Sequence, residues 1–169
     1  MELKPALKKL EESSEFKQWR RKSKSTYLSY AFKIPQEMPN EWQLGFYDRK
    51  KDRITTFVIN ETDVKIRPEE EVFKKEESKI NEVRLESVKI SFDNAAMKAK
   101  EFQEKNFPKD KSVKTIAILQ NLPELGNVWN ITYVTEAFNT LNMKIDASNG
   151  RILEHNLASV FSFRTQDEK

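Results

Sequence analysis

Hydrophobic residues recur every three or four positions at the start of the chain, a spacing that predicts an amphipathic helix ending at about Arg21. The apolar face of this helix carries Leu3, Ala6, Leu7, Leu10, Phe16 and Trp19. Ser13 and Ser14 are two candidates to cap a second helical segment within the same stretch. The chain therefore begins with a helix whose apolar face needs a sheet or another helix to cover.

The pattern then changes to alternating and aromatic residues, which predicts strands over 27–34, 41–47, 53–59 and 63–67. Residues 48–52 form a polar connection of the kind that joins antiparallel strands. Pro68 followed by Glu69, Glu70 and Glu71 fits the first turn of a helix, because proline is tolerated there and carboxylates favour the positive end of the helix dipole. We expect a short helix here that also carries Val72 and Phe73.

The second half repeats the change from helical to strand spacing. Spaced apolar residues over 80–90 indicate a segment laid against the body of the protein, and Ser91 is a plausible N-cap for a helix over 92–107. Ala95, Ala96 and Ala99 give that helix a face of small residues. A strand over 113–121, a turn around Pro123 and Gly126, and two further strands follow.

The last two strands are joined by a run of turn residues between apolar segments, Asp146, Ser148, Asn149 and Gly150. Hydrogen bonds from side chain to backbone and the positive φ that glycine tolerates predict a tight hairpin at this point. Asp146 is a conceivable cation ligand, but its place at the start of the hairpin favours hydrogen bonding to the backbone of its own turn.

Residues 157–163 alternate as well, with Leu157, Phe161 and Phe163 on one face of an extended chain. An unpaired apolar strand invites aggregation, so we expect this segment to be paired. One option is an intramolecular pairing that closes the sheet of the first half. The other is a homodimer interface through 157–163.

The two halves align in sequence at a separation of 87 residues, which places Trp42 on Trp129, Leu44 on Ile131 and Phe46 on Tyr133. The same separation places Tyr30 on Ala117, Phe32 on Leu119, Ile54 on Leu141, Val58 on Ile145 and Ile66 on Leu153. Each half would be a helix followed by a four-stranded antiparallel meander. The alternative is that any two antiparallel meanders share alternating apolar residues.

Composition excludes several kinds of chemistry. The chain has 169 residues, 30 Lys and Arg, 27 Asp and Glu, and no cysteine, so thiol catalysis, cysteine-based zinc sites and disulfides are excluded. The charges of both signs are mixed along the sequence, as on a solubilising surface. The first residues lack the apolar core of a signal peptide, and no run approaches the ~20 residues of a membrane span. We expect a cytoplasmic protein with no membrane association.

The second half combines a capped helix with Ala95 and Ala99, the strand 128–133 around Trp129, and the hairpin 143–153 with its Asp-to-Gly turn. Through these three elements, residues 91–154 resemble the PepSY and PepSY-like domains. In the first half Trp42 is kept, but Asn60-Glu-Thr-Asp63 replaces that turn. The resemblance implies an α+β fold and a non-catalytic binding or regulatory role. The whole chain is also similar to an uncharacterised type of archaeal protein, a resemblance that implies no activity.

Candidate catalytic groups are few. His155 is the single histidine, and we interpret it as an exposed residue at the end of a strand. Only three glycines are present, Gly45, Gly126 and Gly150, so the sequence contains neither a P-loop nor a dinucleotide-binding fingerprint. The carboxylate runs 69–71 and 76–77 are typical of solvated helix faces. We expect no metal or cofactor.

The densest basic cluster comprises Arg20, Arg21, Lys22 and Lys24, close in sequence to Trp19, Tyr27 and Tyr30. Phosphate contacts with base stacking are one interpretation. The other is that cations are favoured at the end of a helix, where they meet the negative end of its dipole. Trp42, Phe46, Trp129 and Tyr133 alternate on strands, so we expect them in the core.

These observations predict an α+β protein with a first unit over 1–67, a charged connector over 68–90, a PepSY-like unit over 91–163 and a tail over 164–169. The leading hypothesis for function is a non-catalytic module that binds a protein or peptide, whose identity the sequence leaves open. The alternative is a nucleic-acid-associated protein that uses the basic cluster. A third hypothesis is an enzyme with an unrecognised carboxylate site.

Overall fold

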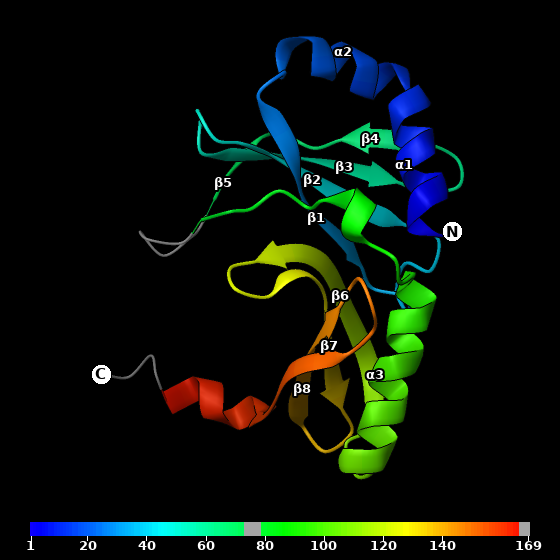
Figure 1. Ribbon diagram of the computed structural model, residues 1–169, viewed down its shortest axis with the longest axis vertical. Coiled ribbons are helices and arrows are strands. Elements are labelled where there is room, and N and C mark those ends of the chain that lie inside the picture. The colour runs from blue at the N-terminus through cyan, green and yellow to red at the C-terminus, as the bar shows by residue number, and fades with distance from the viewer. Residues whose placement is uncertain (73–78, 166–169) are drawn as a thin grey trace.

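A computed structural model of the chain describes residues 1–72 and 79–165. Its nine strands form one antiparallel sheet in the order β4-β3-β2-β1-β6-β7-β8-β9, with β5 beside β3. The helices pack against one face of this sheet, α1 and α2 over the first half and α3 over the second (Figure 1). The predicted α+β class is confirmed.

The N-terminal helix is broken in two by a serine. Helix α1 spans Leu3–Glu12 and buries Leu3, Ala6 and Leu10. Helix α2 spans Ser14–Lys22, and its N-cap is Ser13, whose hydroxyl accepts a hydrogen bond from the backbone N–H of Phe16 at 3.2 Å. Ser13 thus caps the second segment, as one of the two predicted candidates. The change of direction lets both helices follow the sheet.

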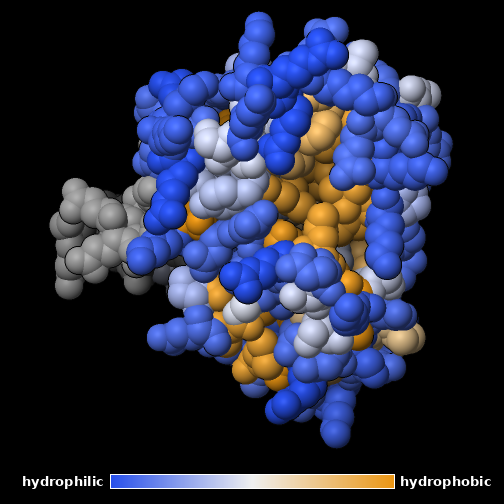
Figure 2. Space-filling model, turned by 45° about the horizontal axis from the view of Figure 1, so that its top comes forward, coloured by the Kyte–Doolittle hydropathy of each residue, from blue (hydrophilic) through white to orange (hydrophobic). Residues whose placement is uncertain are grey.

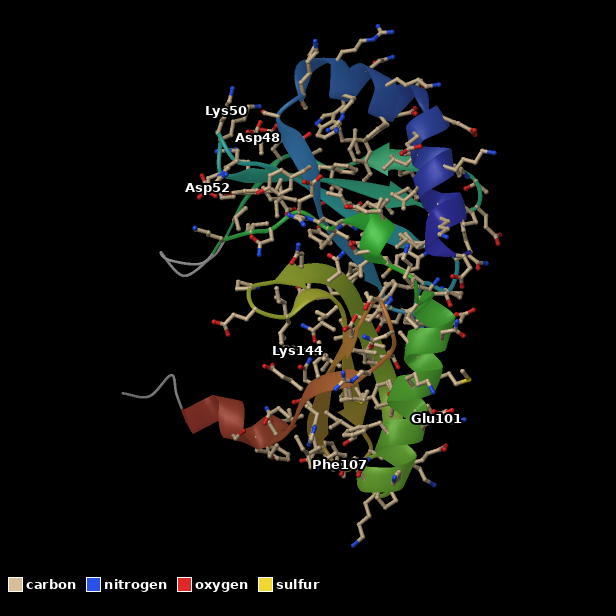
Figure 3. All side chains as sticks on the ribbon, viewed as in Figure 1. Asp48, Lys50, Asp52, Glu101, Phe107 and Lys144 are labelled. Carbon is tan, nitrogen blue, oxygen red and sulfur yellow. The ribbon has the colours of Figure 1, made fainter. Side chains whose placement is uncertain are left out.

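The first half of the sheet contains β1 (Thr26–Lys33), β2 (Trp42–Asp48), β3 (Arg53–Ile59) and β4 (Val64–Ile66). The connection between β2 and β3, with Asp48, Lys50 and Asp52, lies on the side of the molecule away from α1 (Figure 3). Asp52 takes a positive φ of 54° in this turn. The predicted strands are confirmed, with boundaries that shift by a residue or two.

The helix predicted after Pro68 is wrong. Residues Glu70–Glu71 form the short strand β5, which pairs with Ile54 and Arg53 of β3. Two ion pairs hold this extended segment, Lys51 with Glu69 at 3.2 Å and Arg53 with Glu71 at 3.3 Å. The glutamates are therefore stabilised by the cations of Lys51 and Arg53 and by pairing with β3, and not by the positive end of a helix dipole. Phe73, which was expected on this helix, lies outside the described residues.

The connector after residue 79 lies against the body of the protein, as predicted. Val83 is buried, and its N–H donates to the carbonyl of Leu28 at 2.8 Å. The short 3-10 helix η1 (Leu85–Ser87) follows, and Lys89 and Ile90 both donate to the carbonyl of Ala147. The connector is thereby hydrogen-bonded to both halves.

Helix α3 spans Phe92–Asn106, and its N-cap is Ser91, whose hydroxyl accepts from the N–H of Asn94 at 3.2 Å. Ala95 and Ala99 are fully buried. Both the predicted cap and the predicted small-residue face are confirmed. Small side chains let the helix axis lie close to the large residues of the sheet.

The second half of the sheet contains β6 (Ser112–Leu122), β7 (Gly126–Thr135), β8 (Asn139–Asp146) and β9 (Ile152–Ser159). The predicted Asp146 hairpin joins β8 to β9. The Asp146 carboxylate accepts from the N–H and the hydroxyl of Ser148 at 2.7 and 2.6 Å, and Gly150 has a φ of +80°.

The prediction for residues 157–163 is correct only in part. Leu157 lies in β9 and pairs with Leu141 of β8, so the pairing is intramolecular but does not involve the sheet of the first half. The strand stops at Ser159, opposite Asn139, because β8 begins there and supplies no backbone partner beyond it. The chain then coils into the 3-10 helix η2 (Val160–Thr165), so Phe161 is not extended. The side chain of Phe163 lies outside what the structure describes.

A single hydrophobic cluster joins the two halves, and it includes the expected core aromatics Trp42, Phe46, Trp129 and Tyr133. The rings of Trp42 and Trp129 lie 6.2 Å apart between centroids, and Phe92 contacts both. The indole of Trp42 donates to the carbonyl of Met1 at 2.9 Å, and that of Trp129 donates to the carbonyl of Ile90 at 3.0 Å.

The constant separation of 87 residues between the halves is wrong outside β2 and β7. Trp42 pairs with Ile59 and Trp129 pairs with Ile145, so Ile59, and not Val58, takes the place that corresponds to Ile145. Likewise Ala31 faces Leu44 where Ala117 faces Ile131. A shift of one residue moves a side chain to the other face of a strand. The sequence-based pairs of Tyr30, Phe32, Ile54, Val58 and Ile66 are therefore out of register.

Candidate functional site

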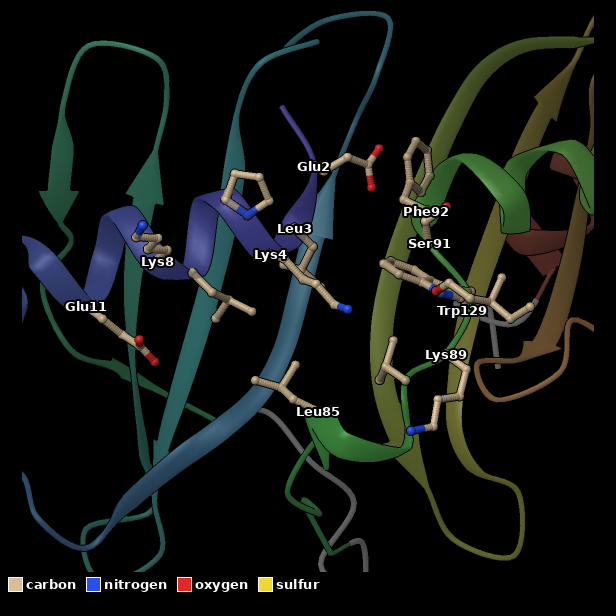
Figure 4. Close-up of a pocket in the computed structure, with 14 residues that line it drawn as sticks. Glu2, Leu3, Lys4, Lys8, Glu11, Leu85, Lys89, Ser91, Phe92 and Trp129 are labelled. Atoms are coloured by element: carbon tan, nitrogen blue, oxygen red, sulfur yellow. The ribbon is translucent and has the colours of Figure 1, made fainter.

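An apolar groove lies where the two halves meet. One wall is formed by α1, with Leu3, Pro5 and Leu7. The opposite wall is the connector, with Leu85, Val88 and Ile90, and the groove continues to Phe92 and Trp129 (Figure 4). Its volume is about 590 Å³, which falls in the range of ligand pockets.

Hydrophobic residues dominate the inner surface of this groove. Phe92 and Trp129 are buried at its end, while Leu85 is 38% exposed on the connector. Hydrophobic surface framed by hydrophilic side chains is also visible in the space-filling view (Figure 2). An exposed apolar surface rimmed by polar residues is typical of a binding site.

Charged side chains form the rim. Lys4, Lys8 and Lys89 line the groove together with Glu2 and Glu11 (Figure 4). Burial, followed by the neighbouring carboxyl of Asp93, raises the pKa of Glu2. The rim therefore carries three lysines and two glutamates, and the pKa of one of these glutamates is raised.

A buried lysine lies between the start of α1 and the start of α3. The ammonium group of Lys33 donates to the carbonyl of Pro39 at 2.6 Å and lies 5.0 Å from the ring centroid of Trp42 and 5.8 Å from that of Phe92. Burial lowers the pKa of Lys33, while Glu2 and Asp93 act in the opposite direction. These contacts fix the end of the groove that is formed by the two helix starts.

The structure brings together three of the four residues of the basic cluster. Arg20, Arg21 and Lys24 line a shallow hollow of about 480 Å³ on α2, with Lys17, Phe16 and the acidic Glu11 of α1. Lys22 is exposed and does not line the hollow.

Arg20 has a structural task within this cluster. Its guanidinium donates to the carbonyl and hydroxyl of Thr26 at 2.9 and 2.7 Å, which ties the end of α2 to the start of β1. Arg21 and Lys24 are exposed at this hollow. Lys17 lines it as well, but its ammonium group donates to the backbone carbonyl of Glu12 at 2.9 Å.

The other candidate residues do not form a reaction centre. His155 is exposed, as expected, but it lies within β9, where its ring contacts Phe102 and Phe107 at centroid distances of 5.0 and 5.8 Å. Glu69 and Glu71 pair with cations across the turn, and the run 76–77 lies outside the described residues. Among the described residues, no three His, Cys, Asp or Glu side chains gather closely enough to hold a metal ion.

Asp146 serves its own turn, as predicted. Burial acts to raise the pKa of Asp146, but hydrogen bonds from Ser148 and Asn149 outweigh it, and the net effect lowers this pKa. The carboxylate oxygens are thereby occupied by donors of the hairpin.

Sequence reasoning missed the groove because its walls are about eighty residues apart in the chain. The signal that was present is the spacing of Val83, Leu85 and Val88, which predicted that the connector lies against the body. That spacing does not show that the connector lies next to α1.

No protein-family model matches the chain, and no curated protein matches it. Among solved structures, the chain is similar to a "putative lipoprotein" from Clostridium difficile 630, with a TM-score of 0.56 and 13% sequence identity. The match covers 85% of this chain and 90% of the other. At this identity the similarity shows a shared fold. Of the described helices, none has the length and apolar character to cross a membrane.

Proposed function

We propose that the chain is a non-catalytic module that binds a protein or peptide partner, and that the groove between α1 and the connector is its binding site. The observation that carries this proposal is an apolar groove with lysines on its rim, placed where the two halves meet. The resemblance of residues 91–154 to PepSY-like domains supports a binding role, and we propose that these residues are such a unit.

The groove favours a partner segment with apolar side chains flanked by acidic ones. Leu85, Val88 and Leu7 offer contacts for apolar groups, and the rim lysines attract carboxylates. Lys4 and Lys8 lie one helical turn apart on α1, so two acidic side chains of one segment can meet them together.

A peptide library displayed on phage tests this proposal directly. Selection on the purified chain is expected to yield segments that combine apolar and acidic residues. Leu85→Glu is expected to weaken their binding more than about tenfold, because it places a charge against apolar groups. Met97→Glu is the matched control, since Met97 is 51% exposed on α3 and lies outside the groove.

Two results would contradict the groove as binding site. One is a set of selected peptides that bind the Leu85→Glu protein as well as they bind the original. The other is a failure to select any peptide that the original chain retains in a solution assay. Thermal unfolding of both variants serves as the control for folding.

A second candidate function is nucleic-acid association, and one observation favours it. Arg21 and Lys24 line the hollow on α2 together with the ring of Phe16, a combination suited to a phosphate backbone with one stacked base, and the acidic Glu11 lies at the same hollow. Two phosphate contacts, from Arg21 and Lys24, predict a slope of about −1.4 for log affinity against log salt on single strands.

Arg21→Ser with Lys24→Ser should abolish that salt-dependent binding, with Arg20 left in place to hold Thr26. Lys98→Ser with Lys100→Ser on α3 is the matched charge control. Retention of the double Arg21/Lys24 variant on single-stranded RNA equal to that of the original chain would exclude this function for the cluster.

We also infer that the two halves are copies of one unit. In the sheet order, β1 to β4 and β6 to β9 run symmetrically outward from the contact of β1 with β6. The carbonyls that accept from the two indoles, those of Met1 and Ile90, each lie two residues before the first residue of a helix. A superposition of β2 on β7 is expected to place Ile59 on Ile145, and a mismatch there would refute the duplication.

The cytoplasmic location stays a prediction. Fractionation of the native cells with an antibody to the chain tests it, and recovery of the protein in the membrane pellet would contradict it.

A further inference from the structure

The sheet ends at β9, whose outer edge has no strand beside it among the described residues. β9 spans eight residues, Ile152–Ser159, and pairs only with β8. An unpaired edge of this length presents a row of free N–H and C=O groups, which is a template for a further strand.

The two edges of the sheet differ in how they are protected. At the other end, β4 has three residues, carries Lys65 paired with Asp63, and is followed by Pro68. Short length, charge and proline all discourage pairing. β9 contains neither lysine nor proline, and the charge of Glu154 is matched by Lys144 on β8.

Exposed apolar residues gather at the end of this unprotected edge. Leu157 and Val160 are each 38% exposed, Phe161 is 62% exposed and Phe138 is 65% exposed. The N–H of Val160 donates to the carbonyl of Phe138, and the rings of Phe138 and Phe161 lie 6.0 Å apart. These four are half of the eight exposed large hydrophobic residues in the described part of the chain.

We propose that a second copy of the chain covers this edge, with the two β9 strands paired antiparallel about a two-fold axis. The two sheets would then form one continuous sheet across the dimer. The interface is isologous, so each copy offers the same free backbone groups and the same apolar residues to the other.

The symmetry restricts the register. A two-fold axis perpendicular to the sheet keeps the helix-bearing faces of the two copies on the same side, so one residue of β9 must lie opposite itself. His155 and Leu157 pair with the buried Met143 and Leu141, which places both on the helix-bearing face. Glu154 and Asn156 lie on the other face.

Side-chain chemistry favours Asn156 as the self-paired residue. In that register Leu157 of each copy lies opposite His155 of the other, next to the ring cluster that His155 forms with Phe102 and Phe107. Glu154 then lies opposite the small Ala158. An axis at Glu154 would instead set two carboxylates opposite each other, which is destabilising.

Cross-linking tests this register, since the full chain has no cysteine of its own. Asn156→Cys is expected to form a disulfide-linked dimer under mild oxidation, because directly opposed residues bring their Cβ atoms to about 5 Å. Glu154→Cys is the matched control on the same face. Its two copies would lie four residues apart along the strands, roughly 13 Å, and should not cross-link.

Sedimentation equilibrium over a range of concentrations tests the dimer itself. The original chain is expected to show a concentration-dependent dimer mass. Leu157→Lys should raise the dimer dissociation constant more than about tenfold, because it removes an apolar contact and adds a charge in both copies. Leu85→Lys, which alters a leucine of the same 38% exposure in the groove, should leave the dimer unchanged.

A monomeric mass for the original chain at its highest soluble concentration would overturn the proposal. A dimer that Leu157→Lys leaves intact, or cross-linking at Glu154→Cys but not at Asn156→Cys, would overturn it as well. Circular dichroism checks that each variant folds. Because the groove is distant from β9 in the chain and shares no residue with it, peptide selection and dimerisation can fail independently.

Discussion

The two halves of the sheet are covered by helices in different ways. Over the first half, α2 has no fully buried residue, but Phe16 and Trp19 meet Phe46 and Phe57 at ring-centroid distances of 5.1–5.4 Å. Over the second half, α3 presents Ala95 and Ala99, which are fully buried against the sheet.

This difference shows that helix and sheet can be fitted together by opposite means. Beneath α2 large rings on both sides fill a wide space, and beneath α3 small residues on the helix meet large ones on the sheet, such as Ile131 and Met143. Interiors are closely packed in either case. The first interface should therefore be sensitive to removal of atoms, and the second to addition of atoms.

The largest expected effect comes from Phe57→Ala in the aromatic cluster. Phe57 is fully buried and contacts three other rings, so its truncation should lower the free energy of unfolding by about 3–5 kcal/mol. Urea denaturation followed by circular dichroism measures this change. Phe138→Ala, at a ring that is 65% exposed, is the control and should cost less than about 0.5 kcal/mol. Equal losses of unfolding free energy in Phe57→Ala and Phe138→Ala would contradict the idea that the aromatic cluster under α2 is sensitive to the removal of atoms.

Ala99→Leu is the converse change, in the second half. Three extra carbon atoms at a fully buried position must push α3 away from the sheet, with an expected loss of about 1–3 kcal/mol. The same denaturation experiment applies. Met97→Leu, on the exposed side of α3, should be close to neutral. A stabilised Ala99→Leu protein would mean that unfilled space remains under α3.

The helix caps give a smaller and more local contrast. Ser91→Ala and Ser13→Ala each remove one hydrogen bond to a first-turn N–H, at a cost of about 1 kcal/mol. Since α2 buries no residue fully, the Ser13 change should mainly speed hydrogen exchange within 14–22, while the Ser91 change should lower global stability. If both variants speeded hydrogen exchange equally across the whole sheet, this distinction between a local and a global effect would be contradicted.

The smallest expected effect concerns the turns. Asn60 receives hydrogen bonds from Thr62 and Asp63 in the first half, and Asp146 receives them from Ser148 and Asn149 in the second. Because the pKa of folded Asp146 is lowered, its contribution to stability is complete above its ordinary value of 3.8 and is lost as the pH falls through the lower folded value.

Asp146→Asn should abolish that part of the pH dependence and bring the second turn closer to the first. Thermal unfolding at a series of acidic pH values measures it, with Glu104→Gln on the exposed side of α3 as the control. Identical pH profiles for the Asp146→Asn and original proteins would show that the turn does not titrate in this way.

Local signals in the sequence predicted much of the fold. The strand 53–59 was predicted with the boundaries of β3, and Ser13, Ser91 and the Asp146 turn were predicted for the roles they have. Each depends on hydrogen bonds or periodicity within a few neighbouring residues. Such interactions depend on residues that are close in the sequence, so the sequence alone can predict them.

Predictions failed where a distant segment decided the outcome. Glu70 and Glu71 became a strand because β3 lay open beside them, and β9 ended at Ser159 because β8 supplied no partner beyond Asn139. The groove required α1 to meet the connector, and Leu7 and Leu85 give no sign of each other in the sequence. The basic residues around Arg21 were found because they are adjacent in the chain.

The meeting of Trp42 and Trp129 gives the protein an internal optical probe. Two indole chromophores at a centroid distance of 6.2 Å and an interplanar angle of 50° are close enough for their electronic transitions to couple. One belongs to each half, whereas Trp19 lies in the aromatic cluster of α2. Their near-ultraviolet circular dichroism should therefore vanish as soon as either half loosens from the other. Separation of the halves can thus be followed spectroscopically in the unlabelled chain.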